Sequence, residues 1–172
     1  DLRIGDGPWL SSGQVATDDE RRELDLRRGV VTRRAVLTGP DGNRLELLQR
    51  SFASMDDPHL AVLETTINAP DRSCIVTLRA GIDAGVRNTN VAAYAGSDAT
   101  HLTPPMFHHI GEITVCEVST RQSRVGIATA VRTSLAGADR TDERRIDAAS
   151  QRVRSRVPEE QMARRLRLRR ES

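Results

Sequence analysis

Short stretches in which apolar and polar residues alternate recur along most of the chain. Leu24 and Leu26, for example, alternate with Asp25 and Arg27, which is the period of a strand with one buried face. Further strands are predicted around residues 2–4 and over 43–52, 59–69, 73–82, 112–119 and 124–132. No convincing helical pattern separates these strands. The sequence therefore predicts an all-β fold, an antiparallel two-sheet β-sandwich rather than a series of βαβ units.

The clearest turn signal is Gly39-Pro40-Asp41-Gly42. Proline presets the backbone angle of a turn, and glycine tolerates a positive φ. The sequence therefore predicts a hairpin that turns at Pro40-Asp41-Gly42, with 43–52 as its return strand. Gly29 interrupts the alternation before this turn, and we interpret it as a bulge or bend within the preceding strand.

This hairpin has apolar residues on both of its faces, whereas a sheet with one wet face would alternate more cleanly. On the first strand, one face carries Val31, Ala35 and Leu37 and the other carries Val30 and Val36. On the return strand, Leu45 and Leu47 likewise lie on the face opposite to that of Leu48 and Phe52. The pattern predicts that part of the outer face is covered. The rest of a larger protein is the natural cover.

Two other segments lead to simpler expectations. Residues 86–110 contain many turn-forming residues and are predicted to be a long loop. Trp9 is the only tryptophan, and a core position is the default for so large an aromatic side chain, with an interface position as the alternative.

Residues 139–172 differ from the rest because they hold 11 Arg and 7 Asp or Glu. Ile146, Val153 and Val157 lie at roughly helical spacing, which predicts a charged tail that is helical or disordered. A basic segment that binds a partner is the alternative. We therefore divide the chain into a β-sandwich over 1–138 and an Arg-rich tail over 139–172.

Composition bounds the class of protein. The chain has 172 residues, enough for about one domain with a real core, and its net charge is only +2. All 26 basic residues are Arg. Nothing in the charge balance demands nucleic acid, and no apolar run is long enough to cross a membrane. Cys74 and Cys116 fall in strand-like runs, and two buried reduced thiols are favoured over a disulfide. The lack of an Asn-x-Ser/Thr sequon favours a cytoplasmic location. Because the first residue is Asp1 rather than Met, we expect a processed chain or a fragment.

Residues with catalytic chemistry are present, but no arrangement of them marks a site. The candidate carboxylates are Asp56, Asp57, Glu64, Asp83, Glu112 and Glu117, and ion pairing with the many arginines is the favoured interpretation. His101, His108, His109 and Cys116 fit no standard zinc spacing. Ser11, Ser12, Ser51 and Ser54 lack the Gly-x-Ser-x-Gly setting of a nucleophile.

Three blocks of sequence, in order and at similar spacing, resemble those of a known family. They are Leu-Asp-Leu-Arg-Arg-Gly-Val-Val-Thr-Arg at 24–33, Arg-Ser-Phe-Ala-Ser-Met-Asp-Asp-Pro-His-Leu at 50–60 and Gly-Ile-Asp-Ala-Gly-Val-Arg-Asn at 81–88. Together they resemble the N-terminal domain of glycoside hydrolase family 65, which includes maltose, trehalose and kojibiose phosphorylases. In the third block, Ala84-Gly85 departs from the usual Leu-Asp-Gly step. The resemblance covers about residues 1–135.

The resemblance implies a large, galactose mutarotase-like β-sandwich that precedes an (α/α)₆ catalytic barrel. In that barrel a glutamate acts as general acid while phosphate, or water with a base, attacks from the opposite side. No position of this chain matches that glutamate, so no catalytic, cofactor-binding or metal-binding residue is assigned. The implied partners are the barrel, a second copy in a homodimer and the disaccharide of the parent, with inorganic phosphate as co-substrate if the parent is a phosphorylase. No cofactor is expected.

The sequence therefore predicts a non-catalytic segment of an enzyme that acts on α-glucosides such as trehalose or maltose. Its role would be to support the catalytic barrel and dimer assembly. A stand-alone carbohydrate-binding β-sandwich is the alternative, although low aromatic content counts against it.

Overall fold

The computed structural model describes residues 1–85, 101–136, 143–147, 150–157 and 164–171, and within them the chain is almost entirely strands. The elements are β1 (Leu2–Ile4), the short 3-10 helix η1 (Leu10–Ser12), β2 (Ala16–Asp25), β3 (Val30–Thr38), β4 (Arg44–Ala53), β5 (Leu60–Asn68), β6 (Cys74–Gly81), β7 (Met106–Ile110), β8 (Ile113–Ser119), β9 (Gly126–Ala136), β10 (Glu143–Asp147), β11 (Ser150–Val157) and β12 (Arg164–Glu171). None of the described segments forms a helix of the length and hydropathy needed to cross a membrane.

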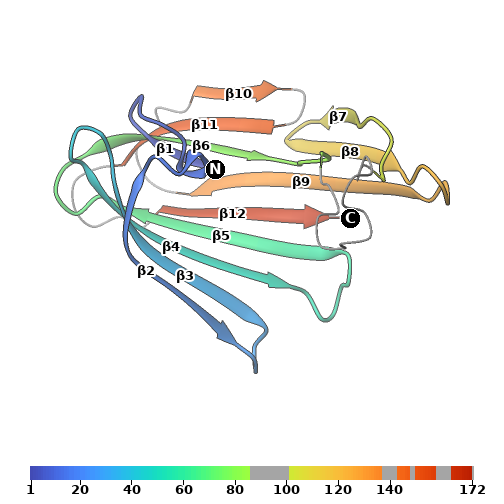
Figure 1. The fold of residues 1–172 in the computed structure, drawn as a ribbon, viewed down its shortest axis with the longest axis horizontal. Coiled ribbons are helices and arrows are strands. Elements are labelled where there is room, and N and C mark those ends of the chain that lie inside the picture. The colour runs from blue at the N-terminus through green and yellow to red at the C-terminus, as the bar shows by residue number, and fades with distance from the viewer. Residues whose placement is uncertain (86–100, 137–142, 148–149, 158–163, 172) are drawn as a thin grey trace, which may run out of the picture.

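The strands form two antiparallel sheets. The small sheet has the order β1-β6-β11-β10, and the large sheet has the order β2-β3-β4-β5-β12-β9-β8-β7. In Figure 1 the strands β10, β11 and β6 lie along the top, and β2 to β5 fan out below them. The predicted all-β, two-sheet sandwich is therefore confirmed.

The core lies where the two sheets face each other. Leu37, Leu45 and Ile67 of the large sheet pack in one cluster with Ile4 and Val76 of the small sheet. Leu37 and Leu45 are completely buried. Burial of each such side chain stabilises the fold by about 1.5–3 kcal/mol. These residues are the inward half of the alternation seen in the sequence.

The hairpin turn at Pro40-Asp41-Gly42 is confirmed. The Gly42 amide donates to the Gly39 carbonyl oxygen at 3.0 Å. Gly42 has a φ of 74°, in the left-handed region that favours glycine.

The interpretation of Gly29 as a bulge inside one strand is wrong, because a second hairpin turn separates β2 from β3. The Gly29 amide donates to the Asp25 carbonyl oxygen at 2.8 Å, and Gly29 has a φ of 65°. The Asp25 carboxylate accepts from the amides of Arg27 and Arg28 and so closes the turn. Leu26 is 85% exposed in this turn, so it is not part of a buried strand face.

The expectation of a helical or disordered tail is wrong for the described residues beyond 138. They form β10, β11 and β12. β11 pairs with β6 over eight positions, with Val153 opposite Leu78, and β12 pairs with β5, with Leu168 opposite Leu63. The sheets therefore continue across residue 138. The division of the chain into a β-sandwich over 1–138 and a separate tail over 139–172 stays a prediction.

Two smaller expectations are also corrected. Residues 106–110 are strand β7 rather than loop, whereas 86–100 lie outside the described residues. Trp9 is not in the core. Its ring is half-buried, with the guanidinium carbons of Arg79 and Arg3 at 4.4 Å and 5.1 Å from its centroid. Cation–π contacts, rather than packing in the core, fix this ring.

A polar contact locks the β3–β4 turn to the β5–β6 connection. The Arg72 guanidinium donates to the side-chain oxygen of Asn43 and, at 2.6 Å, to the Asp41 carbonyl oxygen. Asn43 is buried and donates in turn to the Asp41 carboxylate. Arg72 thus satisfies a buried acceptor in the turn on which the core hairpin depends.

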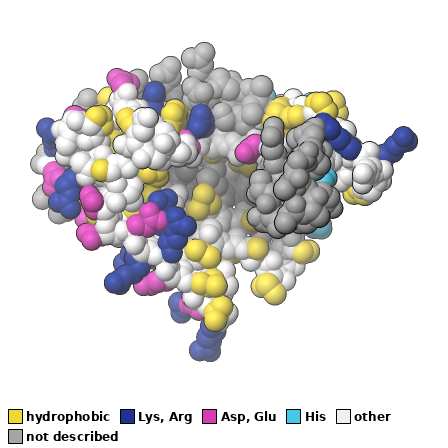
Figure 2. Space-filling model, viewed as in Figure 1, with side chains coloured by type: hydrophobic (Ala, Val, Ile, Leu, Met, Phe, Trp, Pro, Cys, Tyr) yellow, Lys and Arg dark blue, Asp and Glu magenta, His cyan; other side chains and the backbone are white. Residues whose placement is uncertain are grey.

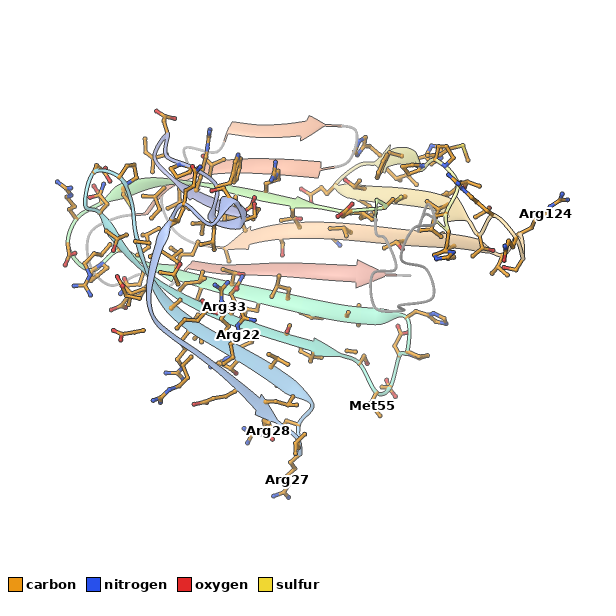
Figure 3. All side chains as sticks on the ribbon, viewed as in Figure 1. Arg22, Arg27, Arg28, Arg33, Met55 and Arg124 are labelled. Atoms are coloured by element: carbon orange, nitrogen blue, oxygen red, sulfur yellow. The ribbon has the colours of Figure 1, made fainter. Side chains whose placement is uncertain are left out.

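Replacing Arg72 by alanine should lower the free energy of unfolding by about 1–3 kcal/mol, because a buried acceptor loses a charged donor. Urea denaturation of the full chain would measure the change. Arg27→Ala is the control, since Arg27 points away from the fold at the β2–β3 tip (Figure 3) and should change stability by less than about 0.5 kcal/mol. Equal effects of the two substitutions would contradict the proposed lock.

Candidate functional site

Charged and polar side chains from four strands meet on the inner face of the large sheet. Two arginines donate to the Glu20 carboxylate, Arg33 at 3.0 Å and 3.2 Å and Arg22 at 2.8 Å. Arg33 also donates to the Gln49 side-chain oxygen at 3.3 Å, and Gln49 donates to the Thr65 hydroxyl at 3.2 Å. We call these five residues the inner-face network. Figure 3 shows Arg22 and Arg33 next to each other on the sheet.

A bulge in β2 brings Glu20 and Arg22 to this face. The register shifts between Asp18 and Arg21, and Asp19 has a φ of 48°. Aspartate is one of the few residues that adopt this left-handed conformation readily. Before the bulge Thr17 lies opposite Leu37, and after it Arg22 lies opposite Arg33. The odd-numbered residues of β2 therefore face inward before the bulge, and the even-numbered residues do so after it.

The network holds Glu20 as a carboxylate. The hydrogen bonds from Arg33, and then those from Arg22, hold the pKa of Glu20 below its ordinary value. A glutamate that is already ionised at neutral pH cannot serve as a general acid there. The network therefore suits charge pairing or ligand orientation better than proton transfer.

A cavity of about 450 Å³ adjoins the network between the sheets. Its lining includes Val31, Ala61 and Leu63 of the large sheet and Ala80 of the small sheet, with Ser51 as a polar exception. On the face drawn in Figure 2, acidic and basic side chains gather beside hydrophobic ones in the lower part of the view, where Figure 1 places the fan of β2 to β5. Such a lining can hold an apolar group but offers little to a sugar, whose hydroxyls need several hydrogen-bond partners.

A second hollow, of about 740 Å³, lies on the outer face of the large sheet. Val36 and Leu48 are half-buried in it, and Arg34, Glu46 and Asn68 lie around them. The Asn68 amide donates to the Glu46 carboxylate at 3.0 Å. We call this hollow the outer groove. It combines an apolar floor with hydrogen-bonding groups, as surfaces that contact another protein domain do.

The candidate carboxylates of the sequence are dispersed and engaged. Glu112 lies 3.8 Å from the Arg132 guanidinium. The Asp83 carboxylate accepts from the Gly85 amide at 2.8 Å, and that of Asp57 accepts from the His59 amide at 3.0 Å. These are surface ion pairs and turn contacts, which are structural roles. Asp56 is exposed in the same β4–β5 connection.

Glu64 and Glu117 also face positive or ionisable groups. Glu64 lies on β5 directly opposite Arg50 of β4, and by register opposite Arg167 of β12. The Glu117 carboxylate lies 3.7 Å from Nε2 of His108. Cross-strand pairs of opposite charge stabilise a sheet, so the ion-pairing interpretation suits both positions.

The histidines do not converge on a metal site. His108 and His109 are neighbours on β7, so their side chains point to opposite faces of the sheet. Nδ1 of His109 lies 3.2 Å from the Thr114 hydroxyl, and His101 is exposed before β7. Among the described residues, no group of three or more His, Cys, Asp or Glu could hold a metal ion.

The two cysteines are buried free thiols, as predicted. Burial raises the pKa of both Cys74 and Cys116. A thiol with a raised pKa is a poor nucleophile at neutral pH.

The serines are not arranged as nucleophiles either. The hydroxyl of Ser11 donates to the Asp1 carboxylate, Ser12 donates to the Trp9 carbonyl oxygen, and Ser54 accepts from the Asp57 amide. Ser51 lines the apolar cavity.

Taken together, the fold and these surfaces define an antiparallel β-sandwich domain with polar and apolar surfaces on its sheets and no marked catalytic centre in the part that is described. The family model "Glycosyl hydrolase family 65, N-terminal domain" matches residues 1–165. The chain belongs to this family.

Relatives and a solved structure agree with this assignment. The chain is 33% identical over 134 residues to an uncharacterized glycosyl hydrolase of Mycobacterium tuberculosis, found in strain H37Rv and in strain CDC 1551. A solved chain named "Putative kojibiose phosphorylase from human microbiome" superposes with a TM-score of 0.77 at 17% identity, covering 99% of this chain and 21% of that one. That likeness shows the fold. The match covers 78% of this chain and only 10% of the length of each curated relative.

Replacing Glu20 by glutamine should make stability less dependent on pH. Because the pKa of Glu20 is lowered in the folded chain, its ion pairs stabilise the fold at neutral pH, and this contribution is lost in acid, as the pH falls through the ordinary pKa of a glutamate and then through the lowered one. The free energies of unfolding of the wild type and of Glu20→Gln should therefore differ at pH 7 and converge in acid. Glu23→Gln, on the same strand, is the control for the loss of one charge. Parallel curves for wild type and Glu20→Gln would contradict a stabilising role for the network.

Proposed function

We propose that the chain is a non-catalytic N-terminal segment of a family 65 disaccharide phosphorylase or hydrolase. The parent acts on α-glucosides such as trehalose or maltose, and inorganic phosphate is its co-substrate if it is a phosphorylase. The segment supports the catalytic (α/α)₆ barrel and the assembly of a homodimer in the cytoplasm. It needs no cofactor and binds neither nucleic acid nor membrane.

The outer groove is the observation that carries this proposal. Val36 and Leu48 lie on the outer side of β3 and β4, where a strand facing only water would carry polar residues. The polar groups around them can pair with a partner at the rim of an interface. Because the match covers only a tenth of the length of each curated relative, the remainder of the parent is the partner that this surface fits.

The engagement of the candidate carboxylates supports a non-catalytic role. An inverting hydrolysis needs two carboxyl groups about 6.5–9.5 Å apart on opposite sides of the sugar, held by rigid supports. Apart from Asp56, which is exposed in the β4–β5 connection, the candidate carboxylates of this chain instead close turns or face arginine and histidine residues. Catalysis therefore belongs to the barrel rather than to this segment.

The alternative, a stand-alone carbohydrate-binding module, finds less support. Such modules stack sugars on exposed aromatic rings, but the Trp9 ring already contacts two guanidinium groups, and Phe107 is half-buried on β7. Ligand-dependent stability separates the two functions. A module at a hundredfold excess of ligand over its Kd gains about 2.7 kcal/mol. We expect no rise in melting temperature with trehalose, maltose or kojibiose, and no release of glucose or glucose 1-phosphate. A clear rise would favour the module.

Replacing Leu48 by aspartate should weaken the docking of the barrel without unfolding the segment. The isolated chain should stay folded and lose about 1 kcal/mol, because Leu48 faces outward and is only half-buried. In the parent, where the segment is joined to the barrel, the same change buries an unpaired charge and should lower the melting temperature. Leu24→Asp, at a 58% exposed position on β2, is the matched control. Docking through the outer groove is wrong if the parent tolerates both substitutions equally.

A further inference from the structure

Among the described residues, the two sheets present four edge strands, and three of them carry features that prevent pairing with another chain. β2 is charged at every position except Ala16, Thr17 and Leu24, and it contains a bulge. β10 is Glu-Arg-Arg-Ile-Asp. β1 has only three residues, and Trp9 bridges to its Arg3. Charge, bulges, short length and local cover are the usual protections of an edge.

β7 is the fourth edge, and it carries none of the charge that protects the others. Its sequence is Met-Phe-His-His-Ile, with no Arg, Asp, Glu or Pro. It pairs with β8 on one side, and the described residues place no strand on its other side. Met106 is 59% exposed and Ile110 is 66% exposed. A free apolar edge of this kind is a template for pairing with another strand.

The flanking sequence sets the limits of this edge. Pro104 and Pro105 precede β7 and supply no amide hydrogens, so pairing cannot extend in that direction. On the other side, Gly111 has a φ of 58° and turns the chain into β8. The free edge is therefore confined to five residues, which fixes a short and definite register.

The sequence of β7 is suited to pairing with itself. Apolar residues lie at both ends, so an antiparallel pair centred on His108 sets Met106 of each copy opposite Ile110 of the other. The strand has no arginine, aspartate or glutamate, so like charges from these residue types do not face each other across the pair. On the adjoining strand, Ile113 and Val115 are half-buried opposite Ile110 and His108, which continues the apolar surface up to Glu117, the exposed residue opposite Met106.

We propose that β7 is the edge through which two copies of this chain associate, by antiparallel pairing of β7 with β7 about a two-fold axis. The proposal gives a surface to the dimer assembly named in the proposed function. The test of this dimer needs neither catalysis nor the barrel. Pairing through β7 can therefore be disproved while the proposed support of the barrel stands, and support of the barrel can be disproved while pairing through β7 stands. A strand of five residues on each side makes a small interface, so we expect a weak dimer, with a Kd of about 1 µM to about 100 µM.

Sedimentation velocity of the full 172-residue chain over a concentration series tests the proposal. The wild type should pass from monomer to dimer, and Ile110→Lys should raise the Kd at least tenfold because it places a charge on the edge. Met55→Lys is the matched control. Met55 is 98% exposed in the β4–β5 connection, and its replacement should leave the Kd unchanged. A wild type that stays monomeric at the highest concentration would overturn the proposal, as would a folded Ile110→Lys variant that dimerises as the wild type does.

Disulfide trapping gives an answer that does not depend on the stability of the lysine variant. His108→Cys sets two cysteines opposite each other at the axis, so oxidised glutathione should convert most of the chain to a covalent dimer. Met55→Cys under the same conditions should remain largely monomeric. Equal cross-linking of the two variants would show random collision rather than pairing through β7.

Discussion

The fold depends on the pairing of its last strands in the interior of both sheets. β12 lies between β5 and β9, so it joins β2–β5 to β9–β7 in one large sheet. β11 lies between β6 and β10 in the small sheet. Without these two strands, the backbone groups of β5, β6 and β9 would lose partners that a sandwich requires. The chain must therefore bring together residues that lie about 70 to about 110 positions apart before the two sheets are complete, which is costly in loop entropy and slow to form.

This arrangement explains why the sequence predicts the first part of the fold well and the last part badly. The hairpin at Pro40-Asp41-Gly42 rests on local turn chemistry and alternation, and both are confirmed. In the tail, the arginines between Val153 and Val157 obscure the same period of two. In β11, Val153 lies opposite Leu78, and in β12, Leu168 lies opposite Leu63. Both strands pair on two sides although they are rich in arginine, so high charge along a segment does not exclude an interior strand.

The inner-face network could not be predicted, because it depends on one residue of bulge. Asp19 in a left-handed conformation changes which residues of β2 face inward, and only then does Glu20 reach Arg33. The only local sign of the bulge is that the inward-facing residues of β2 change from odd-numbered at Thr17 to even-numbered at Arg22. By contrast, the sequence does show that β3 and β4 are apolar on both sides, and Val36 and Leu48 of the outer side lie in the outer groove. That the rest of a larger protein covers them stays a prediction. The match covers only a tenth of the length of each curated relative, which is why we propose the rest of a longer protein as the cover of that surface.

The central claim is that residues 164–171 form an interior strand, and native-state hydrogen exchange of the full chain tests it most directly. The amides of Leu166 and Leu168 should be protected to the same extent as those of β4, because both strands would open only when the whole sheet unfolds. Exchange of residues 164–171 at the rate of an unstructured peptide, while β2 to β5 stay protected, would contradict the account.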